Sequence, residues 1–227
     1  MTQDEKLDFL LRRLLAERKE YGDIRVPDAR SGKRGLLRSL MNVRPPVPAS
    51  AEFLAVQDAY LQERLAERGI TRLQDLTPVR PGLYLWQGDI TTLAADAIVN
   101  AANSRMLGCF VPCHGCIDNA IHTYAGVQLR SECFEMMQRQ GHEEEPGHAK
   151  ITKAYNLPCH SVLHTVGPII HGNVTREDLE RLADCYRSCL ELAVSPPGSS
   201  ISPTNWPRRS PFRRSGSGSR KIQTGSR

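Results

Sequence analysis

The sequence has no long hydrophobic run, and this absence excludes proteins that cross a membrane as helices. Nowhere in its 227 residues do about 18 apolar residues follow one another, which is the shortest stretch that spans a bilayer as a helix. The start of the chain, MTQDEKLDFLLRRLLAERKE, also lacks the basic segment and the small-residue cleavage site of a secretory signal. We therefore expect a cytoplasmic protein with no membrane partner.

The seven cysteines lack what a disulfide framework needs, because their number is odd and no secretory signal accompanies them. Three of them lie with one histidine in LGCFVPCHGC, residues 107–116, a density that favours metal or thiol chemistry. The others are expected to be small buried hydrophobic residues: Cys133, Cys159, Cys185 and Cys189. Three histidines have no ligand-like neighbours and are expected to be packing or surface residues: His122, His164 and His171.

Acidic residues are absent from the last 33 positions, which hold seven of the 30 Lys and Arg residues. The first 194 residues then carry 23 basic and 25 acidic side chains, so the net charge of +5 belongs to residues 195–227. A nearly neutral main body does not favour binding to a phosphate backbone, and we do not expect nucleic acid as a partner. Residues 195–227 also contain 18 Ser, Pro or Gly and no Leu, Val or Ala, a composition typical of a disordered tail.

Residues 1–78 are predicted to form a helical extension interrupted by prolines. Thr2 and Glu5 make a capping-box pattern ahead of a leucine-rich helical face. After the prolines of RPPVP, Ser50 is a predicted N-cap and Gly69 a predicted end of the next helix.

Strand and helix patterns alternate over residues 79–194. GLYLWQGD (82–89) and DAIVNAAN (96–103) are predicted strands, and a helix is predicted to begin at Ile117. AKITKAY and SVLHTVG are two further predicted strands, followed by a helix that Thr175 and Asp178 cap. This order predicts a three-layered α/β domain with ligands bound beyond the carboxyl ends of its strands.

Polar residues stand at two of those predicted strand ends. Asp89 lies in GDIT and Asn103 ends NAAN. Asp and Asn are also common in ordinary turns, so either motif alone is weak. Together they offer an acceptor for an exocyclic amine and an amide for a ribose hydroxyl, which indicates a nucleotide pocket.

The cysteine loop has the spacing of a three-ligand metal site. Adjacent residues of an extended loop point in opposite directions, so Cys113 and His114 are not expected to bind the same ion. Keeping His114 gives Cys109-x4-His114-x-Cys116, a soft donor set that favours zinc and leaves one coordination position open for catalysis. A closed structural zinc site that uses Cys113 or a distant residue, and a set of free thiols, are the alternatives.

GDIT, IVNAANS, LGCFVPCHGCIDNAIH and LHTVGP, in this order and spacing, resemble the zinc-dependent ADP-ribosyl hydrolase branch of the macrodomain family. LLRSLMNVRPP and FLAVQDAYL resemble the helical extension of that branch, so the likeness covers about residues 7–194. The resemblance implies an α/β/α macrodomain with a mixed central sheet and one zinc ion. It implies the following roles: Asp89 and Ile90 for adenine, Asn103 for the ribose, Ile117 and Asp118 for the phosphates or ribose, Asn103 and Asp118 in catalysis, and Cys109, His114 and Cys116 for zinc.

The reaction implied by this resemblance is hydrolysis of mono-ADP-ribose from a modified protein side chain, with an Asp or Glu ester as the expected linkage. The implied partners are a mono-ADP-ribosylated protein, with a lipoyl-carrier protein as the expected target, and a sirtuin-type ADP-ribosyltransferase. Two other hypotheses are a module that binds ADP-ribose without turnover and a protein that binds nucleic acid through its basic tail.

The family pattern stops near Val194. The resemblance requires a further strand, a Ser-Thr-Gly loop around the diphosphate, a Phe-Pro step and a helix, and residues 195–227 show none of them. A shifted reading frame of Ser195–Phe212 permits STGEFHFPNELAAAIAV, which contains the loop, the step and an apolar helix. We therefore predict an incomplete macrodomain over 79–194, caused by a frameshift or deletion, and a weakly active or unstable chain.

Overall fold

The computed structural model describes residues 1–194 and begins with three helices. These are α1 (Gln3–Ala16), α2 (Arg30–Val43) and α3 (Ala51–Arg68), with a short 3₁₀ turn, η1 (Lys19–Tyr21), after the first. The Thr2 hydroxyl accepts from the Glu5 N–H, and the Ser50 hydroxyl accepts from the Phe53 N–H, so both predicted caps are confirmed. No helix within residues 1–194 is long and apolar enough to cross a membrane.

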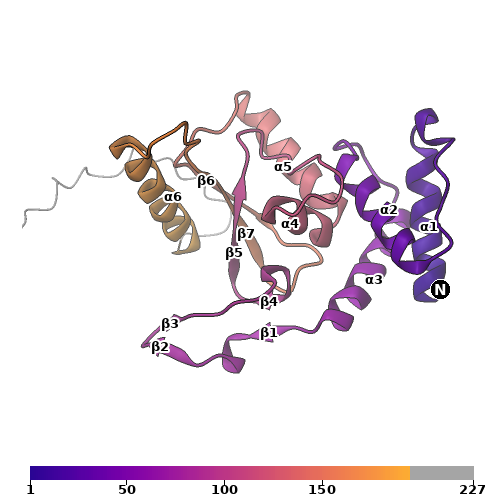
Figure 1. Cartoon of the computed structure of the whole chain (residues 1–227), viewed down its shortest axis with the longest axis horizontal. Helices are drawn as coiled ribbons and strands as arrows, with labels where there is room; N and C mark the ends of the chain where they lie inside the picture. Colours follow the sequence, from indigo (N-terminus) through magenta and orange to yellow (C-terminus); the bar gives the residue numbers. More distant parts are fainter. Residues whose placement is uncertain (195–227) are drawn as a thin grey trace, which may run out of the picture.

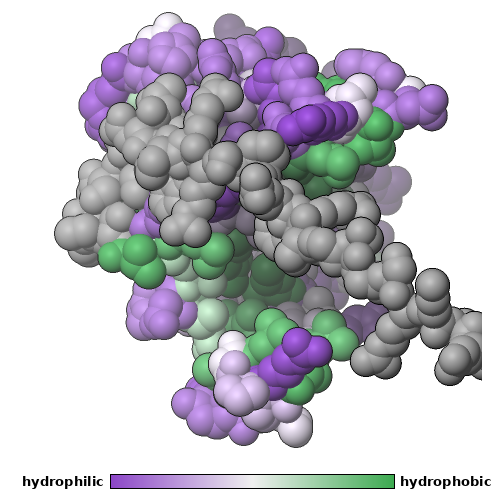
Figure 2. All heavy atoms as spheres, turned by 90° about the vertical axis from the view of Figure 1, so that its left-hand side faces the viewer, coloured by the Kyte–Doolittle hydropathy of each residue, from purple (hydrophilic) through white to green (hydrophobic). Residues whose placement is uncertain are grey.

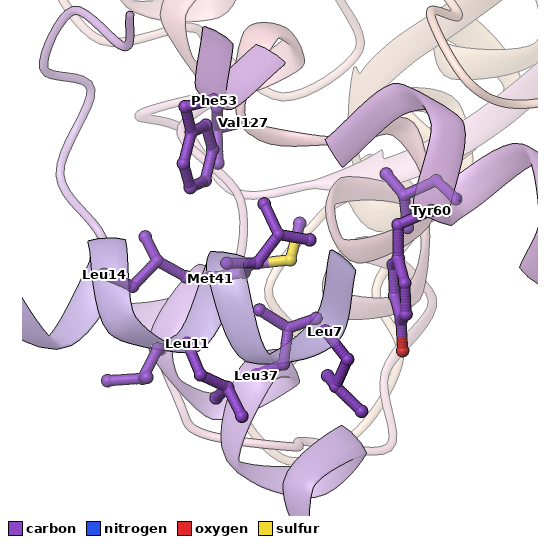
Figure 3. Close-up of a cluster of buried hydrophobic side chains, with 11 residues drawn as sticks. Leu7, Leu11, Leu14, Leu37, Met41, Phe53, Tyr60 and Val127 are labelled. Carbon is purple, nitrogen blue, oxygen red and sulfur yellow. The ribbon is translucent and has the colours of Figure 1, made fainter. Parts of the chain in front are cut away.

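The three N-terminal helices pack around a core of their own (Figure 3). Four leucines of α1 are almost completely buried in it, as their helical spacing predicts: Leu7, Leu10, Leu11 and Leu14. Leu37 and Met41 of α2 and Phe53 of α3 close this core, and Val127 joins it to the rest of the chain. The extension therefore has its own hydrophobic core and also packs on the second part of the molecule.

The second part is a three-stranded mixed sheet between two helical layers (Figure 1). Its strands lie in the order β5 (Ala97–Ala102), β7 (Ser161–Val166) and β6 (Ala149–Lys153); β5 runs parallel to β7 and β6 runs antiparallel to it. Helices α4 (Ile117–Ala125) and α5 (Val127–Gln140) pack on one side of the sheet, and α6 (Arg176–Val194) packs on the other. The prediction of a layered α/β fold with a mixed sheet is confirmed.

The prediction of one long buried strand over residues 82–89 is wrong. Only β3 (Leu83–Tyr84) forms there, paired with β2 (Pro78–Arg80) in a small hairpin, and Leu85 is 83% exposed. Two further short strands, β1 (Thr71–Arg72) and β4 (Leu93–Ala94), pair with each other. The 3₁₀ turns η2 (Leu73–Asp75) and η3 (Ile90–Thr92) complete this region. Within residues 1–194, no strand of the central sheet pairs with residues 82–89, so the apolar pattern here did not make a buried strand of that sheet.

The apolar helical pattern after Ile117 is divided into α4 and α5 at Gly126. The Gly126 φ angle is +98°, in the region that favours glycine, and a Cβ there would lie 2.6 Å from Nε2 of Gln57. Gln57 on α3 instead accepts a hydrogen bond from the Val127 N–H at 3.0 Å. Because of this break, Gln57 of the N-terminal extension caps the first turn of α5.

One side of α6 carries exposed apolar side chains at helical spacing: Leu179, Leu182, Tyr186, Leu190 and Val194. Figure 2 views the molecule from this side and shows hydrophobic surface on it. The predicted disordered tail, 195–227, and its shifted reading frame lie outside the described residues. The domain boundaries at 78 and 194 stay predictions.

Candidate functional site

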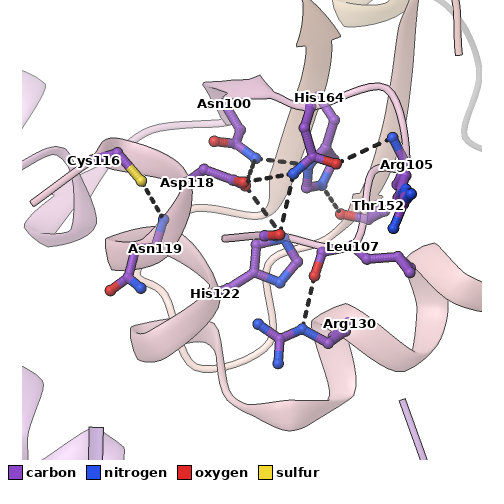
Figure 4. Close-up of polar contacts among 12 residues, drawn as sticks. Asn100, Arg105, Leu107, Cys116, Asp118, Asn119, His122, Arg130, Thr152 and His164 are labelled. Carbon is purple, nitrogen blue, oxygen red and sulfur yellow. Dashed lines mark hydrogen bonds and ion pairs between the residues drawn. The ribbon is translucent and has the colours of Figure 1, made fainter. Parts of the chain in front are cut away.

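Two asparagines, Asn100 within β5 and Asn103 directly after it, contact Asp118 of α4. Figure 4 shows Asn100 beside Asp118. Asn103, the first residue after β5, donates from Nδ2 to the Gly108 carbonyl at 3.1 Å and to Oδ2 of Asp118 at 3.3 Å. Its Oδ1 accepts from the Arg105 N–H at 3.1 Å, which fixes the amide orientation. Asn103 therefore joins the sheet, the start of the cysteine loop and α4 in one place.

Asp118 lies in the first turn of α4 and is almost buried. Its Oδ1 accepts from Asn100 Nδ2 at 2.8 Å, so the two asparagines together hold both carboxylate oxygens. Burial raises the pKa of the Asp118 carboxyl, while these hydrogen bonds and the nearby charge of Arg130 oppose the shift. A carboxylate held in this way has a fixed position and a reduced acidity, both useful for handling a proton or a hydroxyl.

Three of the four candidate metal ligands in the cysteine loop come together. The ligand atoms of Cys109, His114 and Cys116 all lie within 4.8 Å of one another. Cys116 is the N-cap of α4, and its Sγ accepts from the Asn119 N–H at 3.4 Å. Cys113 is not in the group; its Sγ lies 3.4 Å from the Gly35 carbonyl of α2.

This donor set fits zinc by chemistry and by one distance. A tetrahedral zinc ion with a sulfur at about 2.3 Å and an imidazole nitrogen at about 2.0 Å holds these two atoms about 3.5 Å apart. Cys109 Sγ and His114 Nδ1 lie 3.6 Å apart. Three ligands leave a fourth position free, on a loop whose first residues contact Asn103.

Asp89 is the N-cap of η3 and is half exposed. Its Oδ1 accepts from the Thr91 N–H at 2.9 Å, and its Oδ2 accepts from Nη1 of Arg68 at 2.9 Å. The guanidinium of Arg68 also stacks on the ring of Tyr124, 3.7 Å from its centroid. Ile90 packs against the core under α4, as does Ile117. The sequence did not single out Arg68, which brings the end of α3 into contact with η3 and α4.

A buried polar group under the site was missed by sequence reasoning. Asn100 and His164 are neighbours across β5 and β7, and Asn100 Nδ2 lies 3.0 Å from His164 Nδ1. The other ring nitrogen of His164 lies 2.9 Å from Thr152 Oγ1. His164 and His122 are buried, and His171 is exposed. The expectation that these histidines lack ligand-like neighbours is wrong for His122 and His164, because a nitrogen of each ring and Cys133 Sγ all lie within 4.8 Å of one another. The period of two in β5 was the available sign, since it places Asn100 on the same buried face as Ile98.

Known proteins with similar sequences identify the family of the chain. The family model of the Macro domain matches residues 99–202. A protein-ADP-ribose hydrolase of Treponema medium is 58% identical over 198 residues, which are 86% of this chain and 76% of that protein. A protein-ADP-ribose hydrolase of Staphylococcus aureus is 48% identical over 190 residues, which are 83% of this chain and 71% of that protein.

Among solved structures, the crystal structure of a Trypanosoma brucei macrodomain is 32% identical, with a TM-score of 0.49. The match covers 69% of this chain and 65% of that chain, and the family assignment therefore depends on the sequence relatives. Their shared enzyme name, at 48% and 58% identity over most of the chain, confirms the expectation of an enzyme family. The chain belongs to the macrodomain family and is a homologue of its protein-ADP-ribose hydrolases.

Proposed function

We propose that this chain hydrolyses the bond between mono-ADP-ribose and a modified protein side chain, with zinc held by Cys109, His114 and Cys116. The observation that carries the proposal is the bond from Asn103 to the Gly108 carbonyl. This bond fixes Asn103, the predicted ribose ligand, against Gly108, the residue directly before the first predicted zinc ligand, Cys109. A substrate sugar that contacts Asn103 would then lie next to the open coordination position.

We propose different roles for the residues of the site. Asn103 is placed to orient the ribose through its amide, and Asp118 to accept a hydrogen bond or a proton from a ribose hydroxyl or a water molecule. Zinc, when bound, supplies a positive charge that polarises an oxygen ligand. In the reaction, the oxygen of water bonds to the anomeric carbon, the bond from that carbon to the side-chain oxygen breaks, and a proton passes to the released carboxylate.

The finer parts of the proposal come from the family resemblance. We propose an Asp or Glu ester as the linkage, a lipoyl-carrier protein as the target and a sirtuin-type ADP-ribosyltransferase as the enzyme that modifies it, all in the cytoplasm. We also propose slow turnover, because the predicted diphosphate loop is missing from the sequence after Val194.

The test is release of free ADP-ribose from a protein that carries it on a glutamate, measured by mass spectrometry of both products. The proposal predicts unmodified protein and intact ADP-ribose in equal amounts. A chain that binds ADP-ribose but leaves the conjugate intact over many hours, in the presence of zinc, would contradict it and would favour the binding-module hypothesis.

We expect Arg68→Ala to weaken substrate binding and to leave the chemical step unchanged. Arg68 is the cationic partner of Asp89, the predicted adenine ligand, and does not contact the cysteine loop. A hydrogen bond to a charged group contributes about 1.5–3 kcal/mol, so KM should rise about tenfold or more with a nearly constant kcat. Steady-state kinetics check this prediction.

Arg64→Ala is the matched control, since Arg64 lies one turn earlier on α3 and pairs with Glu67. Its KM should equal that of the wild type. A fall in kcat at constant KM in Arg68→Ala would show that Asp89 and Arg68 serve the scissile bond and not the adenine.

A further inference from the structure

The side of α2 that faces the cysteine loop is polar, although the helix belongs to the N-terminal extension. Gly35, Arg38, Ser39 and Asn42 follow one another at helical spacing and thus share one face of α2. Leu37, Leu40 and Met41 point into the core of the extension. The helix therefore uses one face for packing and has a second face for contacts across the molecule.

Arg38 contacts both the cysteine loop and α4. Its Nη2 donates to the His114 carbonyl at 2.9 Å and to Oδ1 of Asn119 at 2.7 Å. Asn119 is completely buried; its side chain donates to the Val111 carbonyl at 3.0 Å, and its backbone N–H donates to Cys116 Sγ (Figure 4). One guanidinium therefore fixes the backbone of one predicted zinc ligand and, through Asn119, the sulfur of another.

Asn42 holds Cys113, the residue directly before His114. Its Oδ1 accepts from the Cys113 N–H at 2.9 Å, and its Nδ2 donates to Thr123 Oγ1 of α4 at 2.9 Å. Asn42 is 1% exposed, so both groups of its amide are used in a dry environment, where hydrogen bonds strongly restrict geometry. Cys113 has a φ angle of +52°, and the bond from its N–H keeps the loop in this unusual conformation.

We propose that Arg38 and Asn42 of the N-terminal extension are positioning residues for the metal site, holding the cysteine loop in the conformation that binds zinc. This inference rests on the proposed zinc site. It assigns a function to the extension that its own core does not explain: α2 is the outer support of the loop, and α4 is the inner one. Groups that orient metal ligands typically change metal affinity by about 10–100-fold when they are removed.

The experiment compares Arg38→Gln and Arg38→Lys with Arg34→Gln in the full chain. Arg34 lies one turn earlier on α2 and pairs with Glu67, away from the loop. Zinc affinity is measured by competition with a chromophoric chelator, and Co²⁺ is substituted to read the thiolate ligands by absorption. Both Arg38 variants should bind zinc about 10-fold to 100-fold more weakly and show an altered Co²⁺ spectrum, with the Tm of the metal-free protein unchanged. The control should match the wild type.

Arg38 variants with wild-type zinc affinity would overturn the inference, and so would a wild-type chain that binds no zinc. A wild-type chain that binds zinc through this loop but does not hydrolyse the substrate would contradict the proposed function only. The role of α2 is tested by zinc affinity, which does not depend on hydrolysis. Asn42→Asp is the second variant. It keeps the acceptor for Cys113 but loses the donor to Thr123, so it should weaken zinc binding less than Asn42→Leu, which loses both.

Discussion

Replacing His114 with alanine should lower the hydrolysis of an ADP-ribosylated protein by at least about 100-fold, because metal-based charge stabilisation contributes several kcal/mol and each 1.4 kcal/mol is a factor of ten in rate. Affinity for ADP-ribose should change little, since Asp89, the predicted adenine ligand, lies on η3 and not on the loop. Single-turnover kinetics measure the first quantity and isothermal titration with ADP-ribose measures the second.

Cys113→Ala is the control for this prediction, because it removes a sulfur from the same loop without removing a predicted ligand. Its backbone N–H still donates to Asn42, and thiol hydrogen bonds are weak, so activity should stay within about threefold of the wild type. Equal losses in His114→Ala and Cys113→Ala would mean that the loop matters for its shape alone. Unchanged activity in His114→Ala would remove the metal from the mechanism.

The free energy of unfolding should fall as the pH drops from about 6.5 to about 4, because burial lowers the pKa values of two histidines, His164 and His122. Burial lowers the pKa of His164 to about 4 from an ordinary value of 6.5. Between pH 6.5 and pH 4 the unfolded chain therefore binds a proton at this histidine and the folded chain does not. The contribution of the neutral histidine to the free energy of unfolding is fully present above pH 6.5 and is lost progressively as the pH falls to about 4. One such histidine gives a slope of about 1.4 kcal/mol per pH unit, or about 3 kcal/mol by pH 4.

Urea unfolding of the wild type and of His164→Gln, at intervals between pH 7 and pH 4.5, isolates this contribution. Glutamine can replace part of the hydrogen bonding to Asn100 and Thr152 but cannot titrate. The stability difference between the two proteins should therefore narrow as the pH falls. His160→Gln, at an exposed histidine, should run parallel to the wild type. Parallel curves for His164→Gln would show that His164 does not carry the effect.

Local patterns in the sequence were sufficient for several parts of the structure. The caps at Thr2 and Ser50 form as predicted because they depend on residues three positions apart. The start of α4 at Ile117 and the convergence of Cys109, His114 and Cys116 follow from spacing within one short loop. The family motifs then placed Asn103 and Asp118 near each other, and a hydrogen bond joins them.

Contacts between distant parts of the chain were beyond these patterns. The pairing of Asn100 with His164 depends on the register of β5 against β7, which no local pattern fixes. Arg68 and Arg38 belong to helices whose polar side chains look solvent-exposed in sequence, yet each reaches a loop of the α/β domain. The prediction of a buried strand at 82–89 failed because this segment pairs only with β2, in a separate two-stranded hairpin, and not with a strand of the central sheet.

The most direct test of the zinc mechanism is the hydrolysis of a glutamate-linked ADP-ribosyl protein before chelation, after exhaustive chelation and after zinc is returned, with the metal content determined at each stage. The account predicts one zinc ion per chain in the active protein, loss of hydrolysis together with the ion, and recovery in proportion to the zinc that Cys109, His114 and Cys116 rebind. Full hydrolysis by a folded chain from which all zinc has been removed would contradict it.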